Sequence, residues 1–437
     1  MHKVEKEGAQ TRTVGLIGAV SIGVGGMVGG GIFAVLGEAV SFAGGATPLA
    51  FLFAGLIALL TAYSYAKLSV HFQNRGGTVY FVDQTFNHNL LSGSLNLFLW
   101  LSYLVTISLY AKAFSSYAQT FLDSPSVWIA HLLISVAIIL PMLINLISSG
   151  FVSRSETFIV GIKLILLLLI MSFGAATIDP VRVEPANWSP LLSVFAAGMI
   201  IFVAYEGFEL IANSAEEIKR PERNLPRALY ISVVGVLILY IGIALVVVGS
   251  VPQEKLLQAK DYALAIAAEP ALGEFGFQLV AIAALMATFS AINATIYGNA
   301  RLGYLLAKEG ELPEVLDHQK HQIPINGILT IAVISLLLAN SIDLTEIAII
   351  GSAGFLLIFS IVNFSAYKLR AQIGANRWIV LLAFLASSIA LLVLLYETLI
   401  TNPLAISVFA GFIAVSVIFE WFYGRIIRQH WFTRRYS

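Results

Sequence analysis

Apolar stretches long enough to cross a lipid bilayer recur along nearly the whole chain. The hydrocarbon core of a membrane is about 30 Å thick, so a spanning helix needs about 20 mainly apolar residues. Twelve stretches approach or exceed this length, and the connections between them are too short for a separate soluble domain. The stretches lie at 14–37, 46–70, 95–121, 126–147, 155–176, 190–213, 228–250, 274–300, 326–341, 346–367, 378–397 and 403–423.

The composition agrees with this pattern. The 437 residues are 58% hydrophobic and only 11% charged, whereas soluble domains carry about 25% charged residues. The net charge of zero gives no reason to expect a nucleic-acid partner, and the absence of cysteine excludes disulfides, thiol nucleophiles and cysteine metal sites. The sequence therefore predicts an all-α polytopic membrane protein with twelve transmembrane helices.

The positive charges predict the orientation of the chain, because cytoplasmic loops are enriched in lysine and arginine. Of the 25 Lys and Arg residues, 20 lie in the termini and in alternate connections, and two lie inside spans. The connections on the opposite side hold only Arg182, Lys255 and Lys260. Both termini are therefore expected to be cytoplasmic, and the protein is expected to lie in the plasma membrane of the cell.

Lys163 lies in the middle of the apolar run Phe158–Ile170, without an acidic neighbour in sequence. A lysine at such a position costs about 2.5–3.5 kcal/mol on insertion scales, and such residues usually face partner groups and carry protons or ions. Nine helical residues after Arg154 place Lys163 roughly 13 Å inside the span, near the midplane. The alternative is that its side chain reaches the interface.

The first span contains an unusual density of glycine. Six of residues 23–31 are glycine, and Gly29, Gly30 and Gly31 are consecutive. Each glycine costs about 1 kcal/mol relative to alanine in a helix. Close helix packing explains some of them, but three in a row favour a local break, which a bilayer tolerates only where the backbone lines a cavity or is buried in protein.

The sixth span combines Gly207 with two carboxylates, Glu206 and Glu209, in the segment Ile201–Leu210. This composition also predicts an interrupted helix. Exposed N–H groups at the start of a half-helix suit an anion, and unwound carbonyls suit a cation. Both poles together fit a zwitterion such as an amino acid, although they could also serve a substrate and an ion separately.

Interruptions in the first and sixth spans are the expected signature of two five-span repeats, the second inverted relative to the first. On this division the first repeat is 14–176 and the second is 190–370. Two further spans follow at 377–424, and 1–13 and 425–437 are cytoplasmic termini.

Several motifs carry a resemblance to a known family. They are Gly29–Phe33, Ala204–Glu209, Glu216–Arg227, Ser290–Ala294 and, with Arg301, Ala307–Pro313. Together they resemble the amino acid–polyamine–organocation (APC) superfamily of transporters. The lysine in the fifth span is similar to that of its ApcT-like, proton-coupled amino acid transporters. The resemblance implies the LeuT fold, with ten core helices in two inverted repeats and two peripheral helices.

The resemblance also implies a substrate site. The substrate carboxylate would bind the backbone N–H groups of Gly29, Gly30 and Gly31. The substrate amine would bind the carbonyls of Met27, Val203, Ala204 and Glu206. Lys163 would occupy the place of a sodium ion in sodium-coupled relatives, beside the carbonyl of Gly25 and the hydroxyl of Ser290, with Thr288 as an alternative to Ser290.

These expectations describe a proton-coupled importer of amino acids with broad, mainly neutral specificity. Its partners would be amino acids, protons and membrane lipid, and it would use no metal and no cofactor other than the coupling proton. The alternatives are a sodium-coupled transporter, an amino acid or polyamine exchanger, a channel and a non-transporting sensor. The chain lacks the catalytic motif that a membrane enzyme would need.

Other residues have less specific interpretations. Glu206 could tune selectivity, share the proton or hold the break, and Glu209 is expected to be structural. Glu216 and Glu217 suit ion pairs with Arg220 and Arg227, which could act as a gate, and Lys112 suits the membrane interface. Metal binding by His318 and His321 is not expected, whereas Phe202, Tyr205 and Phe208 could gate the site.

Overall fold

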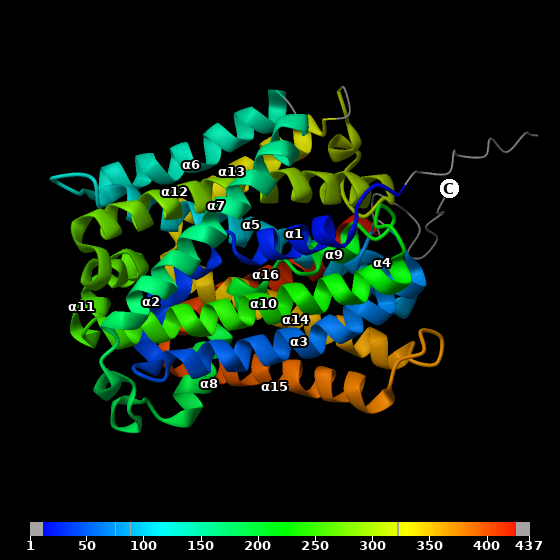
Figure 1. Cartoon of the computed structure of the whole chain (residues 1–437). Coiled ribbons are helices and arrows are strands. Elements are labelled where there is room, and N and C mark those ends of the chain that lie inside the picture. The colour runs from blue at the N-terminus through cyan, green and yellow to red at the C-terminus, as the bar shows by residue number, and fades with distance from the viewer. Residues whose placement is uncertain (1–11, 75, 88, 148, 321–322, 425–437) are drawn as a thin grey trace, which may run out of the picture.

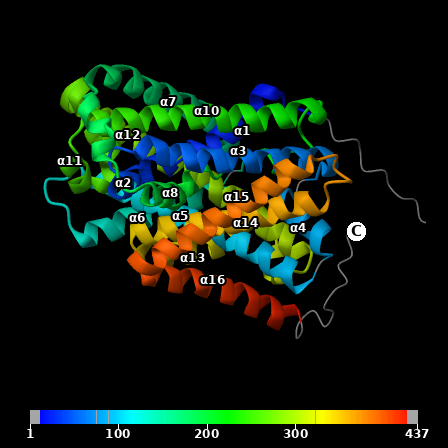
Figure 2. The same ribbon diagram turned by 90° about the horizontal axis from the view of Figure 1, so that it is seen from below.

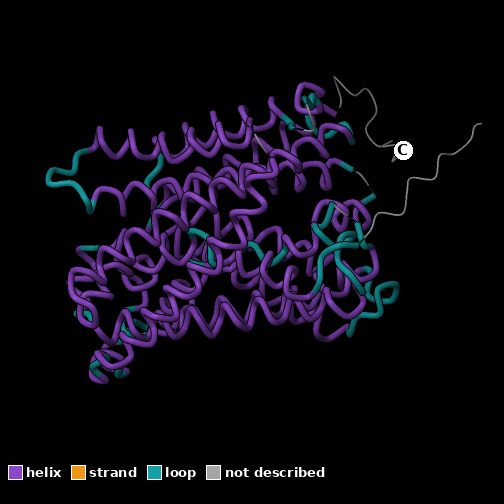
Figure 3. The backbone as a smooth tube through the Cα atoms, turned by 45° about the horizontal axis from the view of Figure 1, so that its top comes forward, coloured by secondary structure: helices purple, strands orange, loops and turns teal. Residues whose placement is uncertain are grey.

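The computed structural model describes residues 12–74, 76–87, 89–147, 149–320 and 323–424, and the side chains of 149–158 lie outside this description. The described chain is helical, with only isolated β-bridges beside the helices. Long helices run side by side along one direction, and the described chain begins and ends at the same end of this bundle (Figure 1). Nearly all of the backbone between the turns at the two ends is helix (Figure 3).

The helices follow the predicted spans closely. They are α1 (Leu16–Met27), α2 (Gly31–Ala43), α3 (Thr47–Phe72), α4 (Thr78–Phe86), α5 (Leu90–Gln119), α6 (Val127–Ile147), α7 (Ser149–Gly174), α8 (Leu191–Ile200), α9 (Leu210–Asn213), α10 (Pro221–Ser250), α11 (Gln253–Gln258), α12 (Ala263–Lys308), α13 (Ile325–Ser341), α14 (Leu344–Lys368), α15 (Arg377–Thr401) and α16 (Pro403–Phe422). Short 3-10 helices include η4 (Phe202–Tyr205) and η5 (Lys260–Tyr262).

Among the described residues, nine helices are long and apolar enough to cross a membrane, and two bent pairs bring the number to eleven. The twelfth predicted span is α13, which is apolar but has only 17 residues. The bent pairs are α1 with α2, at 47°, and α8 with η4 and α9, at 52°. The prediction of interrupted helices in spans one and six is therefore confirmed.

The seventh and eighth spans begin furthest ahead of the starts that hydropathy indicated. The seventh span, α10, starts at Pro221, because proline at a first helical position has no N–H to leave unpaired. The eighth, α12, starts at Ala263 and is kinked at Gly273, where φ is +62°. Hydropathy could not reveal either extension, because the added turns lie outside the apolar run.

Span packing positions the two breaks in the middle of the bundle. α3, α8, α10 and α14 pack around them, whereas α6, α13, α15 and α16 lie toward the periphery (Figures 1 and 2). Leucine and valine on the outer faces of these peripheral helices, such as Leu337, Leu392 and Val415, are more than half exposed. Such apolar surface is what a lipid-facing helix presents.

Candidate functional site

The first break covers residues 28–30, and we call it break one. Helix α1 ends at Met27, and α2 begins at Gly31. The N–H of Val28 bonds the carbonyl of Val24. Within the described residues, the N–H groups of Gly29, Gly30 and Gly31 have no recorded hydrogen-bond acceptor. The first N–H groups of a helix lack partners within it and attract anions, so break one presents a group of unused donors.

The second break covers residues 201–209, and we call it break six. Helix α8 ends at Ile200, η4 follows, and α9 starts at Leu210. In contrast to break one, side chains satisfy this backbone. The hydroxyl of Ser352 in α14 accepts the N–H of Val203 at 3.0 Å and donates to the carbonyl of Ile200 at 2.5 Å.

The two interrupted spans touch through their backbones at residues that flank break one. A Cβ at Gly26 would lie 2.8 Å from the carbonyl oxygen of Gly207, and a Cβ at Gly31 would lie 2.9 Å from Cα of Ala204. Gly207 also has φ +116°, a conformation that favours glycine. A Cβ at Gly30 would overlap the ring of Tyr110 in α5. Gly26, Gly31 and Gly207 are therefore required for the close approach of the two spans, and Gly30 for the approach of Tyr110.

Tyr240 in α10 joins the carbonyl groups of the two breaks. Its hydroxyl lies 2.7 Å from the carbonyl oxygen of Met27 and 3.2 Å from that of Ala204. These are two of the four carbonyls expected to receive the substrate amine. Of the other two, Val203 accepts the N–H of Glu206 at 3.2 Å. Sequence reasoning missed Tyr240 because it lies in an ordinary apolar span, far from either break in sequence.

Both carboxylates of span six are buried and hydrogen-bonded. Glu206 accepts from the hydroxyl of Thr106 at 3.0 Å. Glu209 accepts from the hydroxyl of Tyr103 at 3.0 Å and from the N–H of Gly207 at 2.7 Å. The Glu209 carboxylate thus accepts the N–H of Gly207, which in a continuous helix would bond a backbone carbonyl. This is a structural role of the kind expected for Glu209. Every predicted substrate residue is enclosed, and Glu206, the most exposed side chain among them, shows only 5% of its surface.

Lys163 in α7 is also enclosed, with 2% of its surface exposed. Its ammonium lies 3.5 Å from the carbonyl oxygen of Ala287 in α12. Val160, one turn earlier in α7, would lie 3.0 Å from a Cβ at Gly25. Lys163 therefore lies where α7 meets both α1 and the turn of α12 that precedes Ser290. The hydroxyl of Thr288 is engaged by carbonyls of its own helix, those of Ala284 and Leu285.

The aromatic side chains beside break six are packed in the core. Phe202 and Phe208 contact the ring of Phe359, and the hydroxyl of Tyr205 donates to the carbonyl of Phe51. Lys112 pairs with Asp343 at 3.6 Å at the end of α5. The backbone at Glu217 and Lys219 bonds that of Val14, which ties the start of the described chain to this segment. His321 lies outside the described residues.

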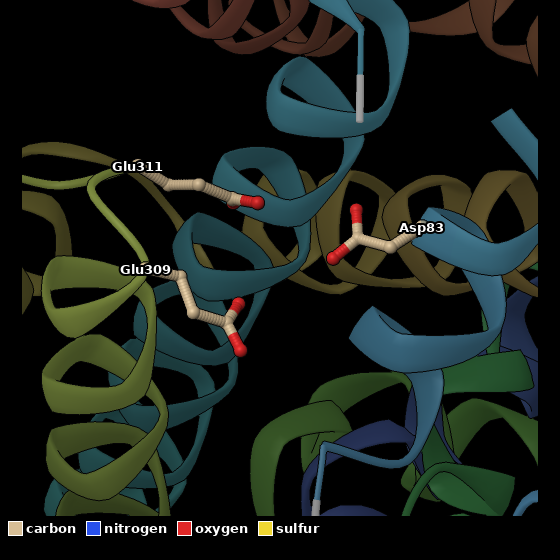
Figure 4. A group of neighbouring side chains, drawn as sticks. All are labelled: Asp83, Glu309 and Glu311. Carbon is tan, nitrogen blue, oxygen red and sulfur yellow. The ribbon is translucent and has the colours of Figure 1, made fainter. Parts of the chain in front are cut away.

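A group of acidic side chains lies at the opposite end of the bundle from α11. Asp83 in α4, Glu309 and Glu311 point toward one another, with carboxylate oxygens within 4.8 Å (Figure 4). The side-chain N–H₂ of Asn96 donates to Asp83 at 3.0 Å and to Glu311 at 2.9 Å. An amide donor directed at the carboxylates suits a hydrogen-bonded junction between α4, α5 and the residues after α12 better than a set of metal ligands.

Comparison with known proteins identifies the family. Residues 14–424 match the family model described as amino acid permease. The chain belongs to the amino acid permease family. It is therefore an integral membrane protein of a transporter family within the APC superfamily, as the motifs indicated.

Individual relatives cover most of the chain. An uncharacterized protein of Methanocaldococcus jannaschii is 36% identical over 96% of this chain and 97% of its own length. The methylthioribose transporter of Bacillus subtilis is 27% identical, over 84% and 83% of the two chains. The branched-chain amino acid permease BcaP of the same organism is 24% identical, over 83% and 81%.

Proposed function

We propose that this permease is a proton-coupled secondary transporter that imports amino acids of broad, mainly neutral specificity by alternating access. The observation that carries the proposal is the pairing of two unlike poles in one enclosed site. One pole is the set of N–H donors of Gly29, Gly30 and Gly31, which have no recorded acceptor among the described residues, and the other is the pair of carbonyls of Met27 and Ala204 that both bond the Tyr240 hydroxyl. An amino acid carries the anion and the cation that these poles select.

Substrate binding would use backbone groups at both poles. The substrate carboxylate binds the N–H groups of Gly29, Gly30 and Gly31. The substrate ammonium replaces the Tyr240 hydroxyl as the hydrogen-bond donor to the carbonyls of Met27 and Ala204. The carbonyls of Val203 and Glu206 lie on the same break and complete the set. Because backbone groups recognise only the common part of an amino acid, many neutral side chains are accepted.

Lys163 would carry the coupling proton. Burial disfavours a charged ammonium, whereas carbonyl and hydroxyl acceptors favour it. Charged, Lys163 holds α7 against α12 at the carbonyl of Ala287, and we propose the carbonyl of Gly25 and the hydroxyl of Ser290 as its further acceptors; neutral, it releases them. A proton gradient therefore drives the change between outward-open and inward-open states without sodium.

The membrane orientation follows from the charges of the connections. The end of the bundle that carries Arg182, Lys255 and Lys260 faces outward, and both termini face the cytoplasm of the cell. This arrangement places the acidic group of Asp83, Glu309 and Glu311 on the cytoplasmic side.

Uptake into proteoliposomes tests the function. Labelled amino acids are offered under an imposed pH gradient, with and without sodium, and with their decarboxylated amines as competitors. We expect pH-driven accumulation of neutral amino acids that neither sodium nor the amines alter. Accumulation that requires sodium, or uptake that requires amino acid or polyamine inside the vesicle, would establish one of the alternatives. Competition by the amines would refute the carboxylate pole.

A further inference from the structure

A buried carboxylate ties three separate elements together at the end of the bundle that carries α11. Glu38 in α2 is 1% exposed. Its Oε2 lies 2.8 Å from Nζ of Lys260 in η5, and its Oε1 accepts from the hydroxyl of Thr345 in α14 at 2.7 Å. Lys260 also donates to the Thr345 hydroxyl at 3.1 Å. Each of the three side chains therefore contacts the other two.

The backbone around this group is equally close. A Cβ at Gly37 would lie 2.7 Å from the carbonyl carbon of Lys260, so only glycine lets η5 approach α2 this closely. The outer half of span one cannot move away from η5 without separating the Glu38 carboxylate from its ammonium. The Lys260 side chain is 31% exposed, but the Glu38 side chain is only 1% exposed. Separation of the pair is therefore costly, because it leaves the buried carboxylate without its partner in a poorly solvated place.

One face of α14 connects this group to break six. Thr345 and Ser352 are seven residues apart, which is two helical turns, so their side chains lie on the same face. Ser352 is the residue that holds both the N–H of Val203 and the carbonyl of Ile200. A displacement of α14 at its outer end would therefore act directly on the backbone of break six.

We propose that Glu38, Lys260 and Thr345 form an external latch that holds the outer entrance closed, and that α14 couples this latch to break six through Ser352. The proposal rests on the outward orientation and the transport role proposed above. It identifies which side chains keep the entrance shut and how the state of the substrate site reaches them.

The chain contains no cysteine, so a single reporter thiol can test the latch. Ala34 is 1% exposed and lies one turn deeper than Glu38 on the same face of α2. In intact cells, Ala34→Cys is exposed to a membrane-impermeant thiol reagent, and its labelling rate is measured. We expect Lys260→Met to raise this rate by about tenfold or more, because the unpaired carboxylate destabilises the closed state.

Two further variants guard against a fold defect and a general charge effect. Glu38→Lys combined with Lys260→Glu restores an ion pair and should return the labelling rate toward that of the reporter alone. Lys112→Met removes a pair at the same end whose partner, Asp343, is 89% exposed. Exposed pairs contribute little, so this control should leave the rate unchanged. A rate for Lys260→Met equal to that of the reporter alone overturns the latch.

The link through α14 has its own matched pair of variants. Ser352→Ala leaves all three latch residues intact, yet it should raise external labelling about threefold or more if α14 couples the two sites. Ser360→Ala lies on the same helix and removes a buried hydroxyl with no recorded hydrogen-bond partner among the described residues. Equal rates for the two variants overturn the link.

The labelling measurement needs no transport, so it separates this proposal from the proposed function. Normal labelling behaviour in a protein that accumulates no amino acid would refute the transport role alone. A reporter thiol that reacts faster from the cytoplasmic side in Lys260→Met would overturn the external position of the latch.

Discussion

Break one and break six interrupt the first and the sixth span, but the protein completes their backbones in different ways. Break one relies on glycine, and its N–H groups at Gly29, Gly30 and Gly31 have no recorded acceptor among the described residues. Break six is held by side chains, since Ser352, Tyr240 and Glu209 all bond its backbone. A buried N–H without a partner costs free energy, which is why we propose these groups of break one as the site of the substrate carboxylate.

Different elements contact the two interrupted spans. Side chains from α10 and α14 hold break six. The inner half of span one, α1, contacts α7 through Gly25 and Val160 and α10 through Ser232, whose hydroxyl donates to the carbonyl of Val20 at 3.2 Å. Lys163 in α7 lies beside this inner half of span one.

The largest expected effect concerns Lys163. Lys163→Ala should abolish pH-driven accumulation and leave substrate binding within about threefold of the parent, because the lysine bonds the carbonyl of Ala287 in α12, which belongs to neither pole of the proposed site. Uptake under a pH gradient and equilibrium binding are measured on the same preparation. If the variant still accumulates substrate with unchanged pH dependence, the proton is carried elsewhere, and Glu206 becomes the leading candidate.

A second prediction tests the open pole. Gly30→Ala should weaken substrate binding by about tenfold to a hundredfold, because its methyl group overlaps the ring of Tyr110 and displaces the free N–H groups. Gly298→Ala in α12 is the matched control, since nothing lies within 4 Å of a Cβ there. Similar affinities for the two variants would show that break one does not contact the substrate.

The two breaks also differ in how much of their structure the sequence predicts. Break one can be predicted from the local sequence, because three consecutive glycines indicate the interruption of the helix and provide no side chains to bond its backbone. The partners of break six, Tyr240, Ser352 and Tyr103, lie in other spans and are ordinary residues there. No periodicity or motif marks them, since their role depends on long-range packing. The glycine and glutamate of break six predicted its place but not its hydrogen bonds.

The third prediction tests the satisfied break. Glu209→Ala should lower the free energy of unfolding by about 1–3 kcal/mol, because it leaves the N–H of Gly207 and the hydroxyl of Tyr103 without their acceptor. Glu209→Gln keeps an acceptor oxygen and should lose less than half as much. Thermal unfolding of the purified protein in one detergent compares them. Equal losses would mean that charge, and not hydrogen bonding, is what Glu209 supplies.

The smallest expected effect concerns the pole where the breaks meet. Tyr240→Phe removes a hydroxyl that occupies the carbonyls of Met27 and Ala204 in the absence of substrate. The empty site then contains unsatisfied carbonyls, whereas the substrate ammonium can still satisfy them. A net hydrogen bond is worth about 0.5–1.5 kcal/mol, so the variant should bind amino acids about two- to tenfold more tightly. Phe51→Leu, which perturbs the ring packed on Tyr240 but removes no hydroxyl, is the control for repacking. Weaker binding by Tyr240→Phe alone would make the hydroxyl a direct contact of the bound substrate, and the two breaks would then share one polar group in both empty and loaded states.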